Sequence, residues 1–237
     1  MPQMTIGFLG NAGVSLSTQV DGHDVRVYVD AFFHSAPQVG SAPVLTGGDA
    51  EPAAVILATH AHFDHFSPSE TIIAARQSGA VVAGPQEVVA RLAGLLPADR
   101  LAALEPPERK RPYASVTRAF GPVTVTAWRS RHADGGHNSY LVQIGDWRLL
   151  HDGDNESTQW HDPAALRPLD ALFLCPWQGS RADALVEAAS PAHWFLIHLT
   201  DDEMDEHASG RFIPEMFPDN PRPPSATGVR PGGKIVL

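Results

Sequence analysis

The segment THAHFDH at residues 59–65 constrains the fold of this chain more than any other part of its sequence. It places three imidazoles and one carboxylate within six positions, directly after the apolar run at residues 53–58. An apolar run of that length with β-branched residues, ending abruptly in polar ones, predicts a buried strand that delivers a loop.

The spacing of the polar side chains in this loop predicts metal binding. Alternate residues of an extended chain point to the same side, so His60 and His62 can hold one ion together. Asp64 and His65 follow where the chain turns, which can direct them to a second ion nearby. Imidazole nitrogen and carboxylate oxygen suit zinc and similar divalent metals, so we prefer a metal site to a His-rich surface loop.

Length and composition indicate one globular enzyme domain. With 237 residues, 43% of them hydrophobic, the chain can bury a large core, and we expect residues 1–237 to form a single domain. It has neither an apolar run long enough for a bilayer nor a secretory signal, and its one cysteine, Cys175, is compatible with a reducing cytoplasm. The net charge of −10 disfavours nucleic acid. We therefore expect a cytoplasmic protein with a small-molecule substrate and no nucleic-acid or membrane partner, and leave homo-oligomerisation open.

Strands and helices alternate along the chain, which favours a layered α/β fold. Ser67, Pro68 and Glu70 have the order of a capped helix start, and this helix is expected to run to Gly79. A hairpin is predicted at Gly145-Asp146. The other expected strands are 5–9, 25–29, 80–83, 123–128, 139–144, 147–150, 171–174, 193–197 and 234–237; further helices are expected at 84–96 and 181–189, with irregular chain after Phe212.

The His-x-His-x-Asp-His loop after an apolar strand resembles the pattern of the metallo-β-lactamase superfamily. This resemblance covers nearly the whole chain and implies a four-layer αββα sandwich built of two similar halves. It also implies three further metal ligands: a His beyond the middle of the chain, an Asp in a Gly-Asp pair after a strand, and a late His after another strand.

Residues at the required places can be identified from the resemblance. His132 and His137 compete for the third imidazole, and we prefer His132 because it lies closer to the end of the incoming strand. Asp154 belongs to a Gly-Asp pair, whereas Asp152 is interpreted as a turn-forming carboxylate that bonds its own backbone. His198 follows an apolar strand and matches the late His. The resemblance thus implies one site of His60, His62 and His132, a second of Asp64, His65 and His198, and a shared Asp154.

Other residues carry weaker indications. Asp30, at a strand end, resembles the family's buried Asp that orients metal-binding histidines. The segment Gly10-Asn11-Ala12-Gly13 is interpreted as a tight turn, and Cys175 as a buried apolar residue. Residues that could line a pocket or pack in the core are His34, Phe63, Trp160 and Trp177.

These features predict a dinuclear metal-dependent hydrolase. Two divalent ions, with zinc preferred and manganese or iron as alternatives, would share a bridging hydroxide that cleaves an ester, lactone, amide or phosphodiester bond in a small molecule. Asp64 is expected to hold metal and hydrogen-bond the nucleophile, and His137 to donate to the developing oxyanion. The compact length and the Gly-Asp after a hairpin resemble the branch that includes ascorbate-phosphate lactonases. The alternatives are an iron-dependent oxidoreductase using the same pocket and a non-catalytic metal-binding sensor module.

Overall fold

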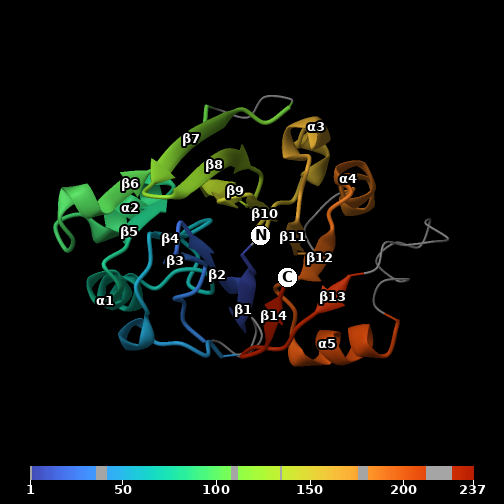
Figure 1. Ribbon diagram of the computed structural model, residues 1–237, viewed down its shortest axis with the longest axis horizontal. Coiled ribbons are helices and arrows are strands. Elements are labelled where there is room, and N and C mark those ends of the chain that lie inside the picture. Colours follow the sequence, from blue (N-terminus) through green and yellow to red (C-terminus); the bar gives the residue numbers. More distant parts are fainter. Residues whose placement is uncertain (1, 36–41, 108–111, 134, 176–180, 212–225) are drawn as a thin grey trace.

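Two facing β-sheets form the centre of the molecule (Figure 1). The computed structural model describes residues 2–35, 42–107, 112–133, 135–175, 181–211 and 226–237. Within these residues each sheet has seven strands, in the order β14-β1-β2-β3-β4-β5-β6 for the first sheet and β13-β12-β11-β10-β9-β8-β7 for the second.

The strands and helices have the following bounds. The first sheet comprises β1 (Thr5–Gly10), β2 (Gly13–Val20), β3 (His23–Val29), β4 (Val55–Leu57), β5 (Val81–Gly84), β6 (Leu101–Ala103) and β14 (Lys234–Val236). The second comprises β7 (Ser115–Phe120), β8 (Val123–Ser130), β9 (His137–Ile144), β10 (Trp147–His151), β11 (Ala171–Leu174), β12 (His193–Leu196) and β13 (Thr227–Gly228). The α-helices are α1 (Pro68–Ser78), α2 (Gln86–Leu92), α3 (Pro163–Leu166), α4 (Ala182–Ala189) and α5 (Asp201–Ala208).

The two sheets repeat one pattern, which confirms the expected similarity of the two halves. In the first sheet β1, β2 and β3 pair antiparallel, and β3 to β6 continue as parallel neighbours. In the second sheet β7 to β10 pair antiparallel, and β10 to β13 are parallel. The late strand β14 pairs with β1, so the end of the chain returns to the first sheet.

Three apolar clusters separate four layers. The largest lies between the sheets and includes Ile6, Val27, Val125 and Phe173. A second packs the first sheet against α1 and α2, and a third packs the other sheet against α3, α4 and α5. Figure 1 shows α1 and α2 on the side of the first sheet and α3 and α4 on the side of the second. The αββα sandwich is therefore confirmed. In the described part of the chain, none of the helices has the length and apolar character that a membrane crossing requires.

Local predictions succeeded where turn chemistry is strong. The hairpin at Gly145-Asp146 is confirmed, with Trp147 opposite Ile144. The first helix ends as expected at Gly79, whose φ of 76° is left-handed. The capping box predicted at the start of this helix is wrong, because the Glu70 carboxylate instead accepts a 2.6 Å hydrogen bond from the Gly47 backbone N–H.

Other boundaries differ from the prediction. The helix α2 ends at Leu92 rather than near residue 96. Strand β2 was not expected, and the turn at Asp21-Gly22 joins β2 to β3. Buried and more exposed positions alternate in β2 from Val14 to Gln19, but one of the buried positions holds the polar Thr18. Of the irregular chain expected after Phe212, residues 212–225 lie outside the described residues.

Candidate metal centre

The seven candidate ligands lie just beyond the carboxyl ends of strands. The loop at residues 59–65 follows β4, and His132 follows β8. Asp154 follows β10, and His198 follows β12. Their donor atoms form two groups, within each of which all atoms lie no more than 4.8 Å apart: His60, His62 and His132 in the first, and Asp64, His65, Asp154 and His198 in the second.

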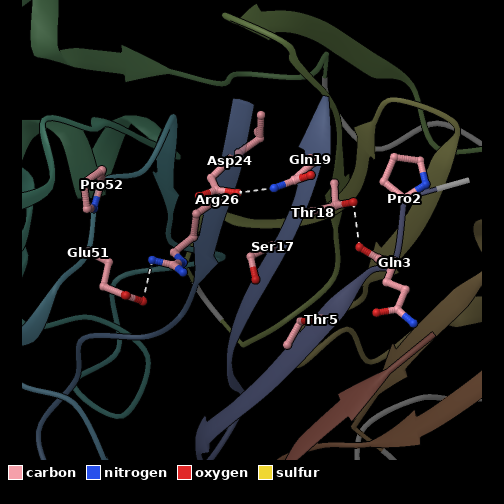
Figure 2. Close-up of a pocket in the computed structure, with 11 residues that line it drawn as sticks. Pro2, Gln3, Thr5, Ser17, Thr18, Gln19, Asp24, Arg26, Glu51 and Pro52 are labelled. Atoms are coloured by element: carbon pink, nitrogen blue, oxygen red, sulfur yellow. Dashed lines mark hydrogen bonds and ion pairs between the residues drawn. The ribbon is translucent and has the colours of Figure 1, made fainter. Parts of the chain in front are cut away.

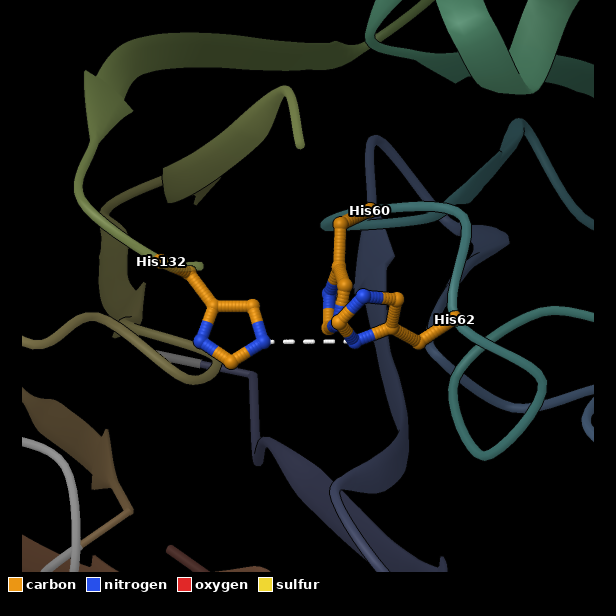
Figure 3. A group of neighbouring side chains, drawn as sticks. All are labelled: His60, His62 and His132. Atoms are coloured by element: carbon orange, nitrogen blue, oxygen red, sulfur yellow. Dashed lines mark hydrogen bonds between the residues drawn. The ribbon is translucent and has the colours of Figure 1, made fainter. Parts of the chain in front are cut away.

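The first group consists of three imidazoles from both sheets. Figure 3 shows His60 and His62 on one loop facing His132 on another. Nε2 of His132 lies 3.2 Å from Nδ1 of His62. Nδ1 of His60 contacts the Thr59 hydroxyl at 2.9 Å, which directs Nε2 of His60 into the group. Burial lowers the pKa of His60 and of His62, so both rings are neutral near pH 7 and can act as metal ligands.

The second group alternates carboxylates with imidazoles. Oδ2 of Asp64 lies 3.2 Å from Nε2 of His198 and 3.4 Å from Nε2 of His65. Oδ2 of Asp154 lies 3.2 Å from Nε2 of His65 and 3.5 Å from Nε2 of His198. It is also 3.9 Å from Nε2 of His132 in the first group. Asp154 is thus the carboxylate that faces both groups, the position expected for a shared ligand.

Burial and charge act in opposite directions on these groups. Burial alone would lower the pKa of His65, but the carboxylates of Asp154 and Asp30 raise it well above its usual value. The pKa of His198 is raised against burial by Asp64 and Asp154. Burial would raise the pKa of Asp154, but His65, His198 and His60 hold it well below its usual range. Burial would also raise the pKa of Asp64, but hydrogen bonds from His198 and His65 lower it. Both carboxylates of the group are therefore ionised at neutral pH.

Two buried polar atoms of the cluster test whether metal ions fit. Nε2 of His60 and Oδ1 of Asp154 are buried and have no hydrogen-bond partner among the described residues. A buried polar atom without a partner costs about 1–3 kcal/mol, and a divalent ion would offer both atoms a partner. The donor set contains only imidazole nitrogen and carboxylate oxygen, which suits zinc, iron or manganese. The residues present therefore fit a pair of divalent ions.

Asp30 supports the loop from beneath. Its carboxylate accepts hydrogen bonds from the Thr59 N–H and the Thr59 hydroxyl, both at 2.7 Å. Its Oδ2 also accepts from Nδ1 of His65 at 2.9 Å, which leaves Nε2 of His65 directed to the cluster. The geometry supports the expected role of Asp30 in orienting a metal-binding histidine.

Two supporting residues were not found from the sequence. Asn11 was interpreted only as part of a turn, and that turn is confirmed. The side-chain N–H₂ of Asn11 also donates to the backbone oxygen of Asp64 at 2.8 Å. The backbone carbonyl of Asn11 accepts from the backbone N–H of His198 at 2.9 Å, which holds His198 at a left-handed φ of 62°. Glu156 accepts from the Ala133 N–H at 2.9 Å and lies 3.3 Å from Nδ1 of His132. No local sequence signal identifies either residue, because each acts across the fold.

His137 belongs to neither group. It is fully buried; Nδ1 lies 2.6 Å from the Ser130 hydroxyl, and Nε2 accepts a 3.0 Å hydrogen bond from the Asp154 N–H. Both ring nitrogens are therefore occupied. This geometry does not support the expected donation from His137 to an oxyanion, and it leaves His132 as the imidazole placed at the cluster.

The interpretation of Asp152 as a turn-forming carboxylate is wrong. Its side chain is fully buried and accepts hydrogen bonds from the Ser139 hydroxyl at 2.6 Å and from Nε2 of His161 at 2.7 Å. The amide of Asn155 donates to both carboxylate oxygens at 3.2 Å. These partners lie on β9 and in the segment after β10, so the carboxylate ties neighbouring segments together.

The remaining expected pocket residues lie in different surroundings. Phe63 is 46% exposed beside the cluster, and His34 is exposed, with Nε2 3.3 Å from the Ser67 hydroxyl. Trp160 packs with the apolar cluster under the helices, and Cys175 is buried between the sheets as expected. Trp177 lies outside the described residues.

The cluster is open to solvent on one side. His62 is exposed and His198 partly so, whereas the other five candidate ligands are buried. A separate groove of about 580 Å³ lies over β1, β2 and β3 (Figure 2). Its lining includes Arg26 and Glu51, which pair with each other at 2.5 Å, and none of the cluster residues. We therefore assign the groove no part in the chemistry.

Comparison with known proteins identifies the family of this chain. The sequence matches the family described as a beta-lactamase superfamily domain over residues 25–208. The chain therefore belongs to the metallo-β-lactamase superfamily. Comparison with curated protein sequences found no match.

Several solved structures share the fold. A protein from Parabacteroides distasonis described as a metal-dependent hydrolase has a TM-score of 0.61 at 16% identity, with 92% of this chain and 90% of that chain covered. Igni18, a metallo hydrolase from Ignicoccus hospitalis, has a TM-score of 0.62 at 13% identity, covering 99% and 98%. CmlA, a diiron β-hydroxylase from Streptomyces venezuelae, has a TM-score of 0.64 at 16% identity, covering 100% of this chain and 54% of that chain.

Proposed function

We propose that this protein is a dinuclear metal-dependent hydrolase that cleaves an ester, lactone, amide or phosphodiester bond in a small molecule. One observation carries the proposal: five imidazoles and two carboxylates converge from the two sheets, and the buried atoms Nε2 of His60 and Oδ1 of Asp154 are among those without a hydrogen-bond partner in the described residues. His60, His62 and His132 would hold one ion, and Asp64, His65 and His198 the other. Asp154 would be shared. Zinc is the ion we prefer for this donor set.

Bound divalent ions would supply Lewis acidity and acidify water at neutral pH. The chain's own residues set the conditions for that chemistry. Asp30 fixes the ring of His65, and Asn11 fixes the Asp64 backbone. Asp64, ionised and 3.2 Å from His198 on the open side of the cluster, can hold a proton-bearing nucleophile by hydrogen bonding. The net charge of −10 favours a small molecule over a nucleic acid as substrate.

The second candidate is an iron-dependent oxidoreductase. The observation that favours it is the likeness in fold to CmlA, which is a diiron β-hydroxylase. Imidazole and carboxylate ligands bind iron as well as zinc, so the donor set is compatible with both metals.

Metal analysis combined with absorption spectroscopy separates the two candidates. Colourless protein with about two zinc ions per chain, which hydrolyses members of a panel of lactones, esters, phosphodiesters and β-lactams, supports the hydrolase. A coloured iron centre that consumes oxygen supports the oxidoreductase. In a hydrolase, His60→Ala and His65→Ala should each lose about one metal equivalent and nearly all turnover while circular dichroism stays unchanged. Unchanged metal content in both variants would exclude the ligand assignment.

A further inference from the structure

A line of buried hydrogen bonds runs from the candidate metal centre into the second sheet. It joins Asp154, His137, Ser130, Ser139 and Asp152 in that order. Every residue in it is at most 2% exposed. Buried polar networks of this kind specify one arrangement when every proton has an acceptor.

The direction of donation along this line follows from its first member. The Asp154 backbone N–H can only donate, so Nε2 of His137 at 3.0 Å must be the unprotonated nitrogen. A neutral imidazole then carries its proton on Nδ1, which donates to the Ser130 hydroxyl at 2.6 Å.

The two serines complete the line. The Ser139 hydroxyl has one proton, and its strongest acceptor is the Asp152 carboxylate at 2.6 Å. The Ser139 hydroxyl also lies 2.8 Å from the Ser130 hydroxyl and can donate to it, which joins the two serines in the line. The line ends on a carboxylate that Asn155 and His161 also hold.

Gly153 shows that this contact needs a close approach. A Cβ atom at Gly153 would lie 2.6 Å from Nε2 of His137, and the residue has a left-handed φ of 53°. The ring of His137 thus sits directly over the backbone that carries Asp154.

We propose that His137 is a positioning residue: it fixes Asp154 in the metal centre through the Asp154 backbone N–H, and Ser130, Ser139 and Asp152 together fix the tautomer of His137. The expected effect of His137 on metal binding rests on the proposed function. The geometry of the hydrogen-bonded line does not. His137 contacts no open surface. Its ring also packs near the rings of His60 and His132, with centroids 5.0 and 5.6 Å away, and its hydrogen bond to the centre is the one from the Asp154 N–H.

Three variants and one control test the proposal. His137→Phe keeps a planar ring but removes both hydrogen bonds, whereas His137→Gln retains one donor and one acceptor. Ser139→Ala removes the hydroxyl that lies three hydrogen bonds from Asp154 along the line. The control is Ser78→Ala, which removes a buried hydroxyl that bonds the Ala74 carbonyl in α1, remote from the centre.

The first measurement uses metal-free protein. We expect ¹⁵N shifts of wild-type His137 to report a neutral ring protonated at Nδ1. We also expect amide exchange at Asp154 to accelerate about tenfold or more in His137→Phe and to stay near the wild-type rate in His137→Gln and in the control. A ring protonated at Nε2, or unchanged exchange in His137→Phe, would overturn the proposal. If His137→Phe does not fold, the measurements on Ser139→Ala and the tautomer of His137 in the wild-type protein decide whether the proposal holds.

The second measurement is zinc affinity by chelator competition, with the cobalt(II) absorption spectrum as a report on ligand geometry. Loss of an outer partner of a metal ligand weakens metal binding by about 10–100-fold. We expect that loss in His137→Phe, a smaller loss in Ser139→Ala, recovery in His137→Gln and none in Ser78→Ala. Wild-type affinity in His137→Phe would overturn the proposal while leaving the function intact. A wild-type protein that binds no metal would refute the proposed function. The measurements on metal-free protein would still decide whether His137 and the hydrogen-bonded line position Asp154.

Discussion

Asp154 differs from the other candidate ligands because its carboxylate faces both groups of imidazoles. Two divalent ions about 3.5–4 Å apart repel each other strongly unless an anion lies between them. The pKa of Asp154 is held well below its usual range against burial by His65, His198 and His60, so that anion is present at neutral pH.

Replacing Asp154 by Asn keeps the shape of the side chain but removes its charge. We expect metal occupancy of Asp154→Asn to fall from about two ions per chain toward one, and residual activity to require higher pH, because one ion acidifies water less than two. Mass spectrometry of the native protein and calorimetric titration measure the occupancy. Asp162→Asn is the matched control, since Asp162 caps the remote helix α3 and Asn caps equally well. Two ions bound at wild-type affinity in Asp154→Asn would contradict the bridging role.

His65 and His198 make metal binding depend on pH. In the metal-free protein nearby carboxylates raise the pKa of both rings above the usual value for histidine despite their burial, which favours their protonated forms. A metal ion needs the unprotonated Nε2 and must displace these protons. We therefore expect zinc affinity to increase as pH rises from 6 to 8, with proton release seen by calorimetry in buffers of different ionisation enthalpy. Affinity independent of pH, without proton release, would show that these rings are not ligands.

At the scale of elements, the turn after β10 brings the Asp154 side chain to the centre. Gly153 adopts a φ of 53°, and an added Cβ would meet Nε2 of His137 at 2.6 Å and Cγ2 of Thr59 at 3.0 Å. The Gly-Asp pair therefore has a physical reason: only glycine fits both the backbone conformation and the packing.

Gly153→Ala should destabilise the metal-free protein by more than the cost of the backbone conformation alone, which is about 1–2 kcal/mol. Gly121→Ala isolates that cost, because Gly121 has a φ of 58° in the turn between β7 and β8 and no atom lies within 4 Å of its added Cβ. Urea unfolding of both variants measures the difference, and Gly153→Ala should also bind metal more weakly. Equal losses of stability would contradict the tight packing of His137 over this turn.

Element prediction succeeded where the signal is local. The strand before the metal-binding loop, the hairpin at Gly145-Asp146 and the strand Ala171–Leu174 follow from apolar runs and turn residues in contiguous sequence. The capping box at Ser67 failed because Gly47, remote in sequence, supplies a better donor to Glu70. Strand β2 has few apolar residues to mark it, because the buried position after Val14 and Leu16 holds the polar Thr18.

At the scale of the whole molecule, the candidate centre joins the two sheets. His60 to His65 follow the first sheet, whereas His132, Asp154 and His198 follow strands of the second. Metal ions held there would connect two halves that otherwise meet mainly through the apolar core between the sheets.

Metal removal should therefore lower the thermal stability of the protein. An ion that binds only the folded state stabilises it by about 2.7 kcal/mol when its free concentration is one hundred times Kd. We expect the unfolding temperature to fall after chelation and to rise again with added zinc in proportion to the logarithm of its free concentration. Differential scanning calorimetry measures this, with His60→Ala as the variant that should respond less. An unfolding temperature insensitive to both chelator and zinc would contradict a metal centre that spans the sheets.

The sequence by itself determined a layered α/β fold and the side chains of the loop at residues 59–65 that meet at the centre, whereas the αββα form came from the family resemblance. Their types and spacing after apolar strands are local features, and the resemblance to the metallo-β-lactamase superfamily supplied the order of the late residues. Only the tertiary structure decided what surrounds them: that Asn11 holds Asp64, that Asp152 anchors a buried network, and that both nitrogens of His137 are occupied. The physical reason is that a hydrogen bond between segments far apart in the chain depends on distances and angles of the folded backbone, and a linear pattern of residue types does not encode these.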